Sequence, residues 1–193
     1  MADMCEIKKI DFLTNKGELG MKILFETERL YLREILPTDA ESMFEMDSDA
    51  EVYKFLGRKP IRNINESKKM IESIRDQYER IGIGRWAIVE KESGNFIGWT
   101  GFKFEKENQN GHSDFYNLKF RLLRKYWGKG YITEATKAAI HYAFTELKIP
   151  EIYSMTLLSN LKSQRVLNKL GFQLEDKFKF QGDDITWYKL TNK

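Results

Sequence analysis

The sequence has one cysteine, two histidines and no long apolar run. The single cysteine, Cys5, excludes an intramolecular disulfide, and such sparse use fits a reducing cytosol. His112 and His141 are far apart in the chain, so no spacing resembles a zinc site and we expect no metal. No stretch approaches the roughly 18–20 apolar residues that span a bilayer, and the N-terminus lacks the apolar segment of a signal peptide. We therefore expect a cytoplasmic protein that binds neither metal nor membrane.

Positive charge is in small excess, and its distribution is uneven. The 32 basic and 29 acidic residues give a net charge of +3, which is too little to indicate a nucleic-acid-binding protein. From Phe115 to Thr133 there is no acidic residue, and there are five cations: Lys119, Arg121, Arg124, Lys125 and Lys129. All other residues therefore sum to −2. This concentration favours a small polyanionic cofactor at one helix terminus over an extended nucleic acid.

The patterning predicts a mixed α/β fold. With 193 residues and 41% hydrophobic composition, the chain can build one core. Residues 1–20 are weakly patterned, so we expect an N-terminal appendage there and a single domain over residues 21–193. Periodicity predicts helices over 39–47, 49–56 and 65–81, another after a turn at 128–130, and a last one over 161–170. It predicts strands near 27–35, 86–89, 96–102, 114–123 and 151–158, and a final pair of strands within 172–190. The unit from 114 to 158 predicts a right-handed crossover between two parallel strands.

The segment after the strand at 114–123 has the features of an anion site. The chain turns through Gly128 and Gly130, and a helix begins at once. The first N–H groups of a helix are free and lie at the positive end of its dipole. Glycines let an anion approach the main chain without meeting a Cβ atom, and Arg124, Lys125 and Lys129 surround the turn. We predict a pyrophosphate cradle; the alternative is a tight connection with solvated lysines.

The same segment resembles the acyl-CoA-binding signature of the GNAT N-acetyltransferase superfamily, Gln/Arg-x-x-Gly-x-Gly/Ala. Lys125 occupies the Gln/Arg position, which keeps a cation there. The run from Tyr126 to Ala135 is similar to the branch that acetylates the N-termini of ribosomal proteins. Three more segments resemble that branch: residues 47–56 its early helix pair, 96–101 its central hairpin strand, and 160–172 its second CoA-contacting helix. The resemblance covers about residues 25–190.

The resemblance implies a GNAT-like α/β (α+β) fold that binds acetyl-CoA. Its central sheet would be mixed and mostly antiparallel, with about six or seven strands flanked by helices. The parallel strands 114–123 and 151–158 would splay around the CoA site. The implied cofactor-binding residues are Leu123, Arg124, Lys125, Trp127, Gly128, Lys129, Gly130, Tyr131, Ile132, Thr133, Asn160 and Ser163. Main-chain groups near Leu123 and Arg124 would hold the thioester and pantetheine, and residues 128–133 the pyrophosphate.

The resemblance also implies direct attack of an amine on the thioester, with residues to manage two protons. Many relatives have a glutamate general base where this chain has Asn117, which could only hold a water. Asp114 is a second candidate, and the alternative is that it is merely solvated. Some family members use a tyrosine as general acid, and this chain has Leu167 at that position. Ser163 is therefore the expected proton donor to the leaving thiolate; the alternative is that its hydroxyl only bonds to a main-chain carbonyl. Asn160 would orient the pantetheine or cap its helix.

Aromatic residues are expected to line an acceptor pocket opposite CoA: Tyr53, Phe55, Trp86, Trp99, Phe115 and Tyr116. About half of these would be core residues instead. A protein N-terminus, an amino acid and another small primary amine all remain open as acceptors, and no acidic cluster favours a polyamine. The rival functions are a non-catalytic acyl-CoA-binding regulatory module and a nucleic-acid-binding domain that uses the basic segment. Monomer and homodimer are both open.

Overall fold

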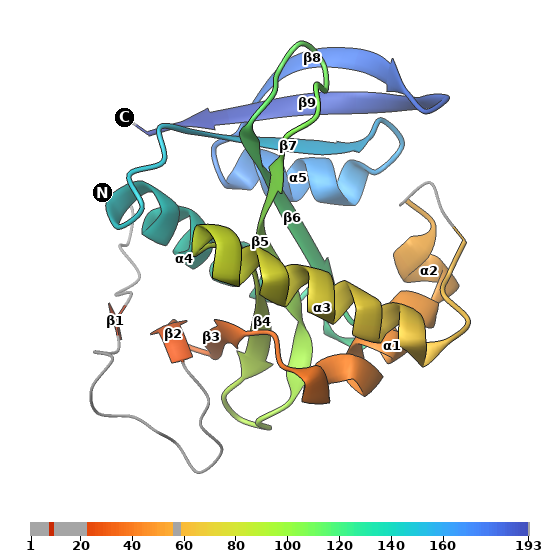
Figure 1. The fold of residues 1–193 in the computed structure, drawn as a ribbon, viewed down its shortest axis with the longest axis vertical. Coiled ribbons are helices and arrows are strands. Elements are labelled where there is room, and N and C mark those ends of the chain that lie inside the picture. The colour runs from red at the N-terminus through yellow and green to blue at the C-terminus, as the bar shows by residue number, and fades with distance from the viewer. Residues whose placement is uncertain (1–7, 10–22, 56–58, 193) are drawn as a thin grey trace.

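The computed structural model describes residues 8–9, 23–55 and 59–192 (Figure 1). In these ranges, nine strands form one sheet in the order β1-β2-β3-β4-β5-β6-β7-β9-β8. The strands are β1 Lys8–Lys9, β2 Ile23–Glu26, β3 Leu30–Glu34, β4 Arg85–Glu90, β5 Phe96–Glu105, β6 Phe115–Leu122, β7 Glu151–Leu157, β8 Gln173–Phe180 and β9 Asp183–Thr191. Every neighbouring pair is antiparallel except β6 and β7. The mixed, mostly antiparallel sheet with one parallel pair is confirmed.

The structure adds two short strands to those that the sequence pattern indicates. β1 has two residues and β2 has four, which is too short for a period-2 pattern to stand out. Lys8 and Lys9 pair with Glu26 and Phe25 at the edge of the sheet. The rest of the predicted appendage, at 1–7 and 10–20, lies outside the described residues, so the boundary at residue 20 stays a prediction.

The two parallel strands separate soon after they meet. Their only paired position is Asn117 with Tyr153, and the Ser154 hydroxyl donates to the Leu118 carbonyl at 3.0 Å. β6 then continues to Leu122 along β5 alone, and β6 and β7 run apart in Figure 1. The predicted splay of this pair is therefore present, and it opens beyond Leu118.

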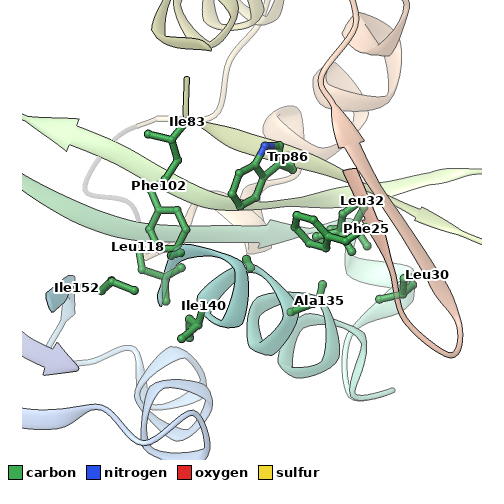
Figure 2. Close-up of a cluster of buried hydrophobic side chains, with 14 of the residues drawn as sticks. Phe25, Leu30, Leu32, Ile83, Trp86, Phe102, Leu118, Ala135, Ile140 and Ile152 are labelled. Atoms are coloured by element: carbon green, nitrogen blue, oxygen red, sulfur yellow. The ribbon is translucent and has the colours of Figure 1, made fainter. Parts of the chain in front are cut away.

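Helices cover both faces of the sheet. They are α1 Ala40–Ser48, α2 Ala50–Tyr53, α3 Ile64–Ile81, α4 Tyr131–Thr145 and α5 Leu161–Lys169, with short 3₁₀ turns η1 Pro37–Asp39 and η2 Arg124–Tyr126. One buried cluster joins the sheet to α4 and α5 through Ala135, Ile140 and Leu167. Figure 2 shows this cluster where α4 crosses the strands. A second cluster joins the other face to α1 and α3 through Met43, Ile71 and neighbouring residues.

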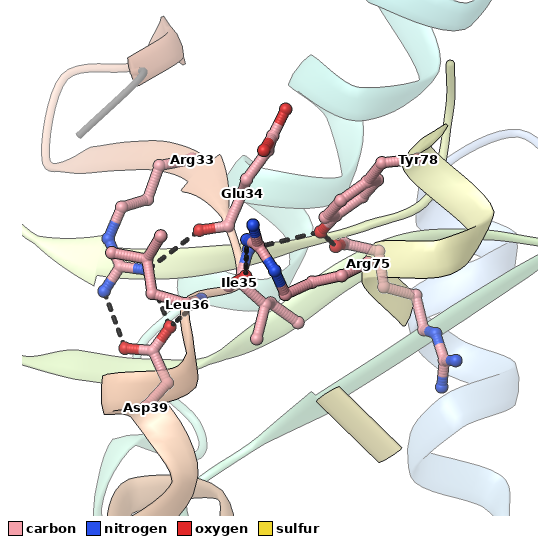
Figure 3. Close-up of polar contacts among 8 residues, drawn as sticks. Arg33, Glu34, Ile35, Leu36, Asp39, Arg75 and Tyr78 are labelled. Carbon is pink, nitrogen blue, oxygen red and sulfur yellow. Dashed lines mark hydrogen bonds and ion pairs between the residues drawn. The ribbon is translucent and has the colours of Figure 1, made fainter. Parts of the chain in front are cut away.

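Buried polar contacts fix the entry to α1 and the start of β4 (Figure 3). The Arg33 guanidinium makes a two-pronged ion pair with Asp39, at 2.7 and 2.8 Å. The Tyr78 hydroxyl of α3 accepts from the Ile35 N–H at 3.2 Å and donates to the Arg85 carbonyl. Burial raises the pKa of Tyr78 well above its usual value, so this phenol remains a donor at any physiological pH. The contact fixes the first residue of β4 against α3.

Candidate active site

The β6–α4 turn holds its glycines in a conformation that other residues rarely adopt. Gly128 has φ +76° and Gly130 has φ +82°, both in the left-handed region that favours glycine. A Cβ atom on Gly128 would meet nothing within 4 Å. Space for a group outside the chain is therefore present directly above the Gly128 main chain.

Three N–H groups at the start of α4 have no acceptor among the described residues: those of Tyr131, Ile132 and Thr133. The first bond of this helix runs from the Glu134 N–H to the Gly130 carbonyl, at 3.1 Å. Free donors at the positive end of a helix dipole suit a bound phosphate. The turn therefore has the donors that a phosphate group needs, and its binding of the CoA pyrophosphate stays a prediction.

Side chains that were not expected in the site support this turn. The Glu134 carboxylate accepts from the Thr27 hydroxyl at 2.5 Å, the Arg29 N–H at 3.0 Å and Arg29 Nε at 2.7 Å. Burial opposes the ionisation of Glu134, but these hydrogen bonds outweigh it and lower its pKa. Arg29 also donates to the Lys129 carbonyl at 3.1 Å and lies over the Tyr131 ring. The loop before β3 thus braces the turn, a contact across about a hundred residues that no local pattern reveals.

The basic segment divides between three surroundings. Three of its cations make ion pairs with acids of the α1–α2 region: Arg121 with Asp47, Arg124 with Asp49 and Lys125 with Glu45. Lys129 lies over the Tyr126 ring, and Lys119 lies on the sheet. Arg124, Lys125 and Glu45 also line a cavity of about 160 Å³ between α1 and the turn. Lys125, which the sequence directs to a phosphate, is therefore oriented toward α1 in this structure.

The main chain before the turn offers one of the two expected donors. The Leu123 N–H already donates to the Ile97 carbonyl at 3.0 Å, so it is not free for a thioester. The Arg124 N–H has no acceptor among the described residues. The Trp127 indole donates to the Leu122 carbonyl at 3.0 Å, which gives Trp127 a positioning role here.

Asn117 is buried at the point where β6 and β7 part. Its Nδ2 donates to Glu105 Oε1 at 3.3 Å, while its Oδ1 is buried without a hydrogen-bond partner. Glu105, the last residue of β5, is 8% exposed and also pairs with Lys103 at 2.6 Å. Sequence reasoning missed Glu105, because the strand predicted near 96–102 ends before it, whereas β5 continues to Glu105, which pairs with Phe115 of β6.

Of the three other polar candidates, Asn160 and Ser163 lie together at the start of α5, and Asp114 lies before β6. Asp114 is exposed, has φ +54° and precedes β6, so it is not on the strand with Asn117. Asn160 is the N-cap of α5, and its Oδ1 accepts from the Ser163 N–H at 3.1 Å. The Ser163 hydroxyl is half-buried and makes no hydrogen bond to the described part of the chain. Ser163 is therefore held by its main chain with its hydroxyl free.

The six predicted pocket aromatics do not gather at one place. Trp99 and Tyr53 each lie 5.1 Å from the Arg121 guanidinium. Trp86 is in the core cluster with α4, on the other face of the sheet, and Tyr116 packs against that cluster. The remaining two are Phe115, packed with Tyr153 and Trp187, and Phe55, beside Lys54. Of the six, only Tyr53 and Trp99 are known to share a neighbour near the opening of the sheet, Arg121, and both are buried.

Within the described ranges, no helix is long and apolar enough to cross a membrane. The same ranges hold no group of three or more His, Cys, Asp and Glu residues that could bind a metal ion.

Comparison with known proteins gives consistent matches. The family model for the acetyltransferase (GNAT) domain matches residues 29–173. The uncharacterized N-acetyltransferase p20 of Bacillus licheniformis is 34% identical over 149 residues, which are 77% of this chain and 82% of that protein. Among the solved structures that share the fold, two have CoA bound. The ribosomal-protein alpha-N-acetyltransferase RimL in complex with coenzyme A has TM-score 0.69 and 19% identity, covering 85% of this chain and 94% of that one. Spermidine N-acetyltransferase of Vibrio cholerae with CoA and spermine has TM-score 0.67 and 17% identity, covering 85% and 96%.

Proposed function

This chain belongs to the GNAT acetyltransferase family, and we propose that it is a cytoplasmic N-acetyltransferase that moves the acetyl group of acetyl-CoA to a primary amine. The observation that carries this proposal is the α4 terminus, where three N–H groups are free, Gly128 and Gly130 are left-handed, and the position beside the Gly128 main chain is open. The structural relatives that bind CoA support it: their titles name a ribosomal-protein acetyltransferase and a spermidine acetyltransferase. The acceptor is a protein N-terminus or a small amine.

The residues of the turn would hold the cofactor mainly through their main chain. The N–H groups of Tyr131, Ile132 and Thr133 would donate to the pyrophosphate, and Gly128 and Gly130 would keep Cβ atoms away from it. Arg29 and Glu134 keep the turn in this shape. Bound acetyl-CoA supplies an activated acetyl thioester. The chain then has to orient an amine and stabilise the developing charge.

Two side chains are suited to the proton transfers. Asn117 Oδ1 is a buried acceptor without a partner, oriented by the bond from its own Nδ2 to Glu105. It can hold a water that removes the proton of the attacking amine. The Ser163 hydroxyl is free to donate and lies at the start of α5, the helix that the resemblance places beside CoA. We assign Ser163 the protonation of the leaving thiolate.

The test is thiol release from acetyl-CoA, measured with a panel of amino acids, peptides and small amines, together with calorimetry of acetyl-CoA binding. Micromolar binding of acetyl-CoA and amine-dependent release of thiol support the proposal. Binding without thiol release on any amine would instead favour a non-catalytic acyl-CoA-binding module. Absence of binding would contradict the whole assignment, and DNA or RNA binding that falls steeply with salt would then indicate the nucleic-acid alternative.

A further inference from the structure

Three cations lie together on the face of the sheet opposite α4. They are Arg85 on β4 and Lys119 and Arg121 on β6, which we call the cation cluster. Arg85 and Lys119 both pair with Gly101 of the intervening strand β5. Since Gly101 has no side chain, none separates these two cations in their row across the sheet. Arg121 is one step along the same face, opposite Trp99.

The cation cluster is poorly neutralised. Arg121 makes an ion pair with Asp47, but Arg85 and Lys119 make no ion pair or hydrogen bond through their charged groups to any described residue. Arg85 lies 5.4 Å from the Trp99 ring, which it shares with Arg121. Both unpaired residues are half-buried. Two cations are therefore removed from much of the solvent without a counter-ion.

The nearest carboxylates do not supply the missing charge. Glu105 pairs with Lys103, and Asp47 is engaged by Arg121, so four cations face two acids. Burial raises the pKa of Asp47, although Arg121 opposes this. Burial and then Arg121 lower the pKa of Arg85 to about 10. Burial lowers the pKa of Lys119 to about 8; Glu105 opposes this, and Lys103, Arg85 and Arg121 add to it. Buried charge without a partner is unfavourable, so an anion that bound here would relieve it.

The cation cluster also lies at the opening of the sheet. Lys119 and Arg121 come after the last paired position of β6 and β7, and before the Leu123–Arg124 main chain that leads into the turn. Tyr53 and Trp99 provide apolar surface beside Arg121. An acceptor in this opening would place one end at the reacting centre and its other end against the cluster.

We propose that the cation cluster binds a carboxylate of the acceptor, so that the substrate is an amine that carries a carboxylate, such as an amino acid. This proposal rests on the proposed function, because it names the acceptor of that reaction. A carboxylate accepts hydrogen bonds from guanidinium and ammonium groups together. A polyamine would bring further positive charge to a region with an excess of cations, and is excluded as a substrate by repulsion.

The first experiment compares amino acids with their carboxamides in the thiol-release assay. The carboxamide keeps the amine and side chain and removes only the anion. We expect kcat/KM to be at least ~10-fold higher for the acids. Arg85→Met and Lys119→Met should each lose at least ~10-fold on the acids and change little on the amides. Lys137→Met is the matched control, since it removes an exposed cation of α4. Equal rates on acids and amides, or a rate with spermidine that exceeds both, would overturn the proposal while leaving the N-acetyltransferase function intact.

A second measurement does not depend on turnover. In protein labelled with ¹³Cε-lysine, the Lys119 resonance, assigned with Lys119→Met, is followed during titration with sodium acetate and with sodium chloride. A saturable shift with acetate but not with chloride supports a carboxylate site. That result holds even if no amine in the panel is acetylated. No shift, or the same shift with chloride, contradicts it. Loss of the acetate shift on addition of CoA would show that the cofactor itself occupies the cluster, which also overturns the acceptor assignment.

Discussion

The β6–α4 turn and the cation cluster are built in opposite ways. The turn is a run of consecutive residues that presents main-chain N–H groups, and its lysines point to other partners. The cluster is assembled from side chains of β4 and β6, with Asp47 and Tyr53 brought over them by α1 and α2. A main-chain site depends on backbone shape and tolerates many side chains. A side-chain site changes its ligand with single substitutions, so the turn suits a shared cofactor and the cluster an acceptor particular to this chain.

The largest effect should come from placing a negative charge in the turn. Gly128→Glu puts a carboxylate where the pyrophosphate would lie and forces φ +76° on a residue with a Cβ atom. We expect acetyl-CoA affinity to fall at least ~100-fold, because like charges brought together cost several kcal/mol. Calorimetry measures the affinity, and circular dichroism checks the fold.

Gly94→Glu is the control for backbone strain. Gly94 has φ +69° and an open position for a Cβ atom, as Gly128 has, but it lies in the turn between β4 and β5. The affinity of the Gly94→Glu variant for acetyl-CoA should equal that of wild type. Equal affinities in wild type and Gly128→Glu would show that the free N–H groups of α4 do not bind the cofactor.

A smaller effect is expected at the start of α5. Ser163→Ala removes the free hydroxyl and keeps the N–H that caps onto Asn160. If Ser163 protonates the thiolate, kcat should fall about 100-fold, while the Kd of acetyl-CoA stays within about threefold. Ser159→Ala, an exposed serine just before the same helix, should leave both values unchanged. A kcat that Ser163→Ala leaves intact would reduce Ser163 to a structural residue and assign the thiolate proton to water.

The β6–α4 turn and the cation cluster also show what could be predicted from the sequence. The glycines, the helix start and the longer strands follow from local patterns, and the structure has them where expected. The aromatic residues were harder, because register decides their face. Trp86 pairs with Thr100, whose hydroxyl meets Thr136 of α4, whereas Trp99 faces Arg121. Both tryptophans lie in apolar strand segments, and composition does not distinguish the two faces.

The distribution of charge was the least predictable feature. Five cations without an acid in one segment indicated a single polyanion, yet Asp47, Asp49 and Glu45 neutralise three of them from more than seventy residues away. Lys119 is in the same basic segment as the turn, but it belongs to the sheet face with Arg85, which lies outside that segment. Pairings across such distances depend on tertiary packing, so the segment alone could not show which cations are neutralised.

The smallest effect concerns stability and separates the cation cluster from an ordinary solvated lysine. The pKa of Lys119 is about 8 in the folded chain and about 10.4 when unfolded. Below about pH 8 Lys119 is charged in the folded protein, and its burial lowers the free energy of unfolding. Between about pH 8 and pH 10.4 the unfolded chain binds more protons than the folded chain, so the free energy of unfolding rises with pH. Lys119→Met should be more stable than wild type at pH 7.5, and that gap should narrow by under about 1 kcal/mol by pH 8.5.

Urea unfolding at both pH values measures the gap in the free energy of unfolding. Arg85, Arg121, Lys103 and Glu105 face Lys119 in both proteins, so their own titration largely cancels in the comparison. Lys137→Met, which removes an exposed lysine, should show no such change with pH. At pH 7.5, saturating acetate should raise the free energy of unfolding of wild type more than that of Lys119→Met, because the bound anion compensates the buried charge. A gap that is constant with pH and acetate would mean that Lys119 is charged without cost, and the cation cluster would then lack the unmet charge on which its role as a carboxylate site depends.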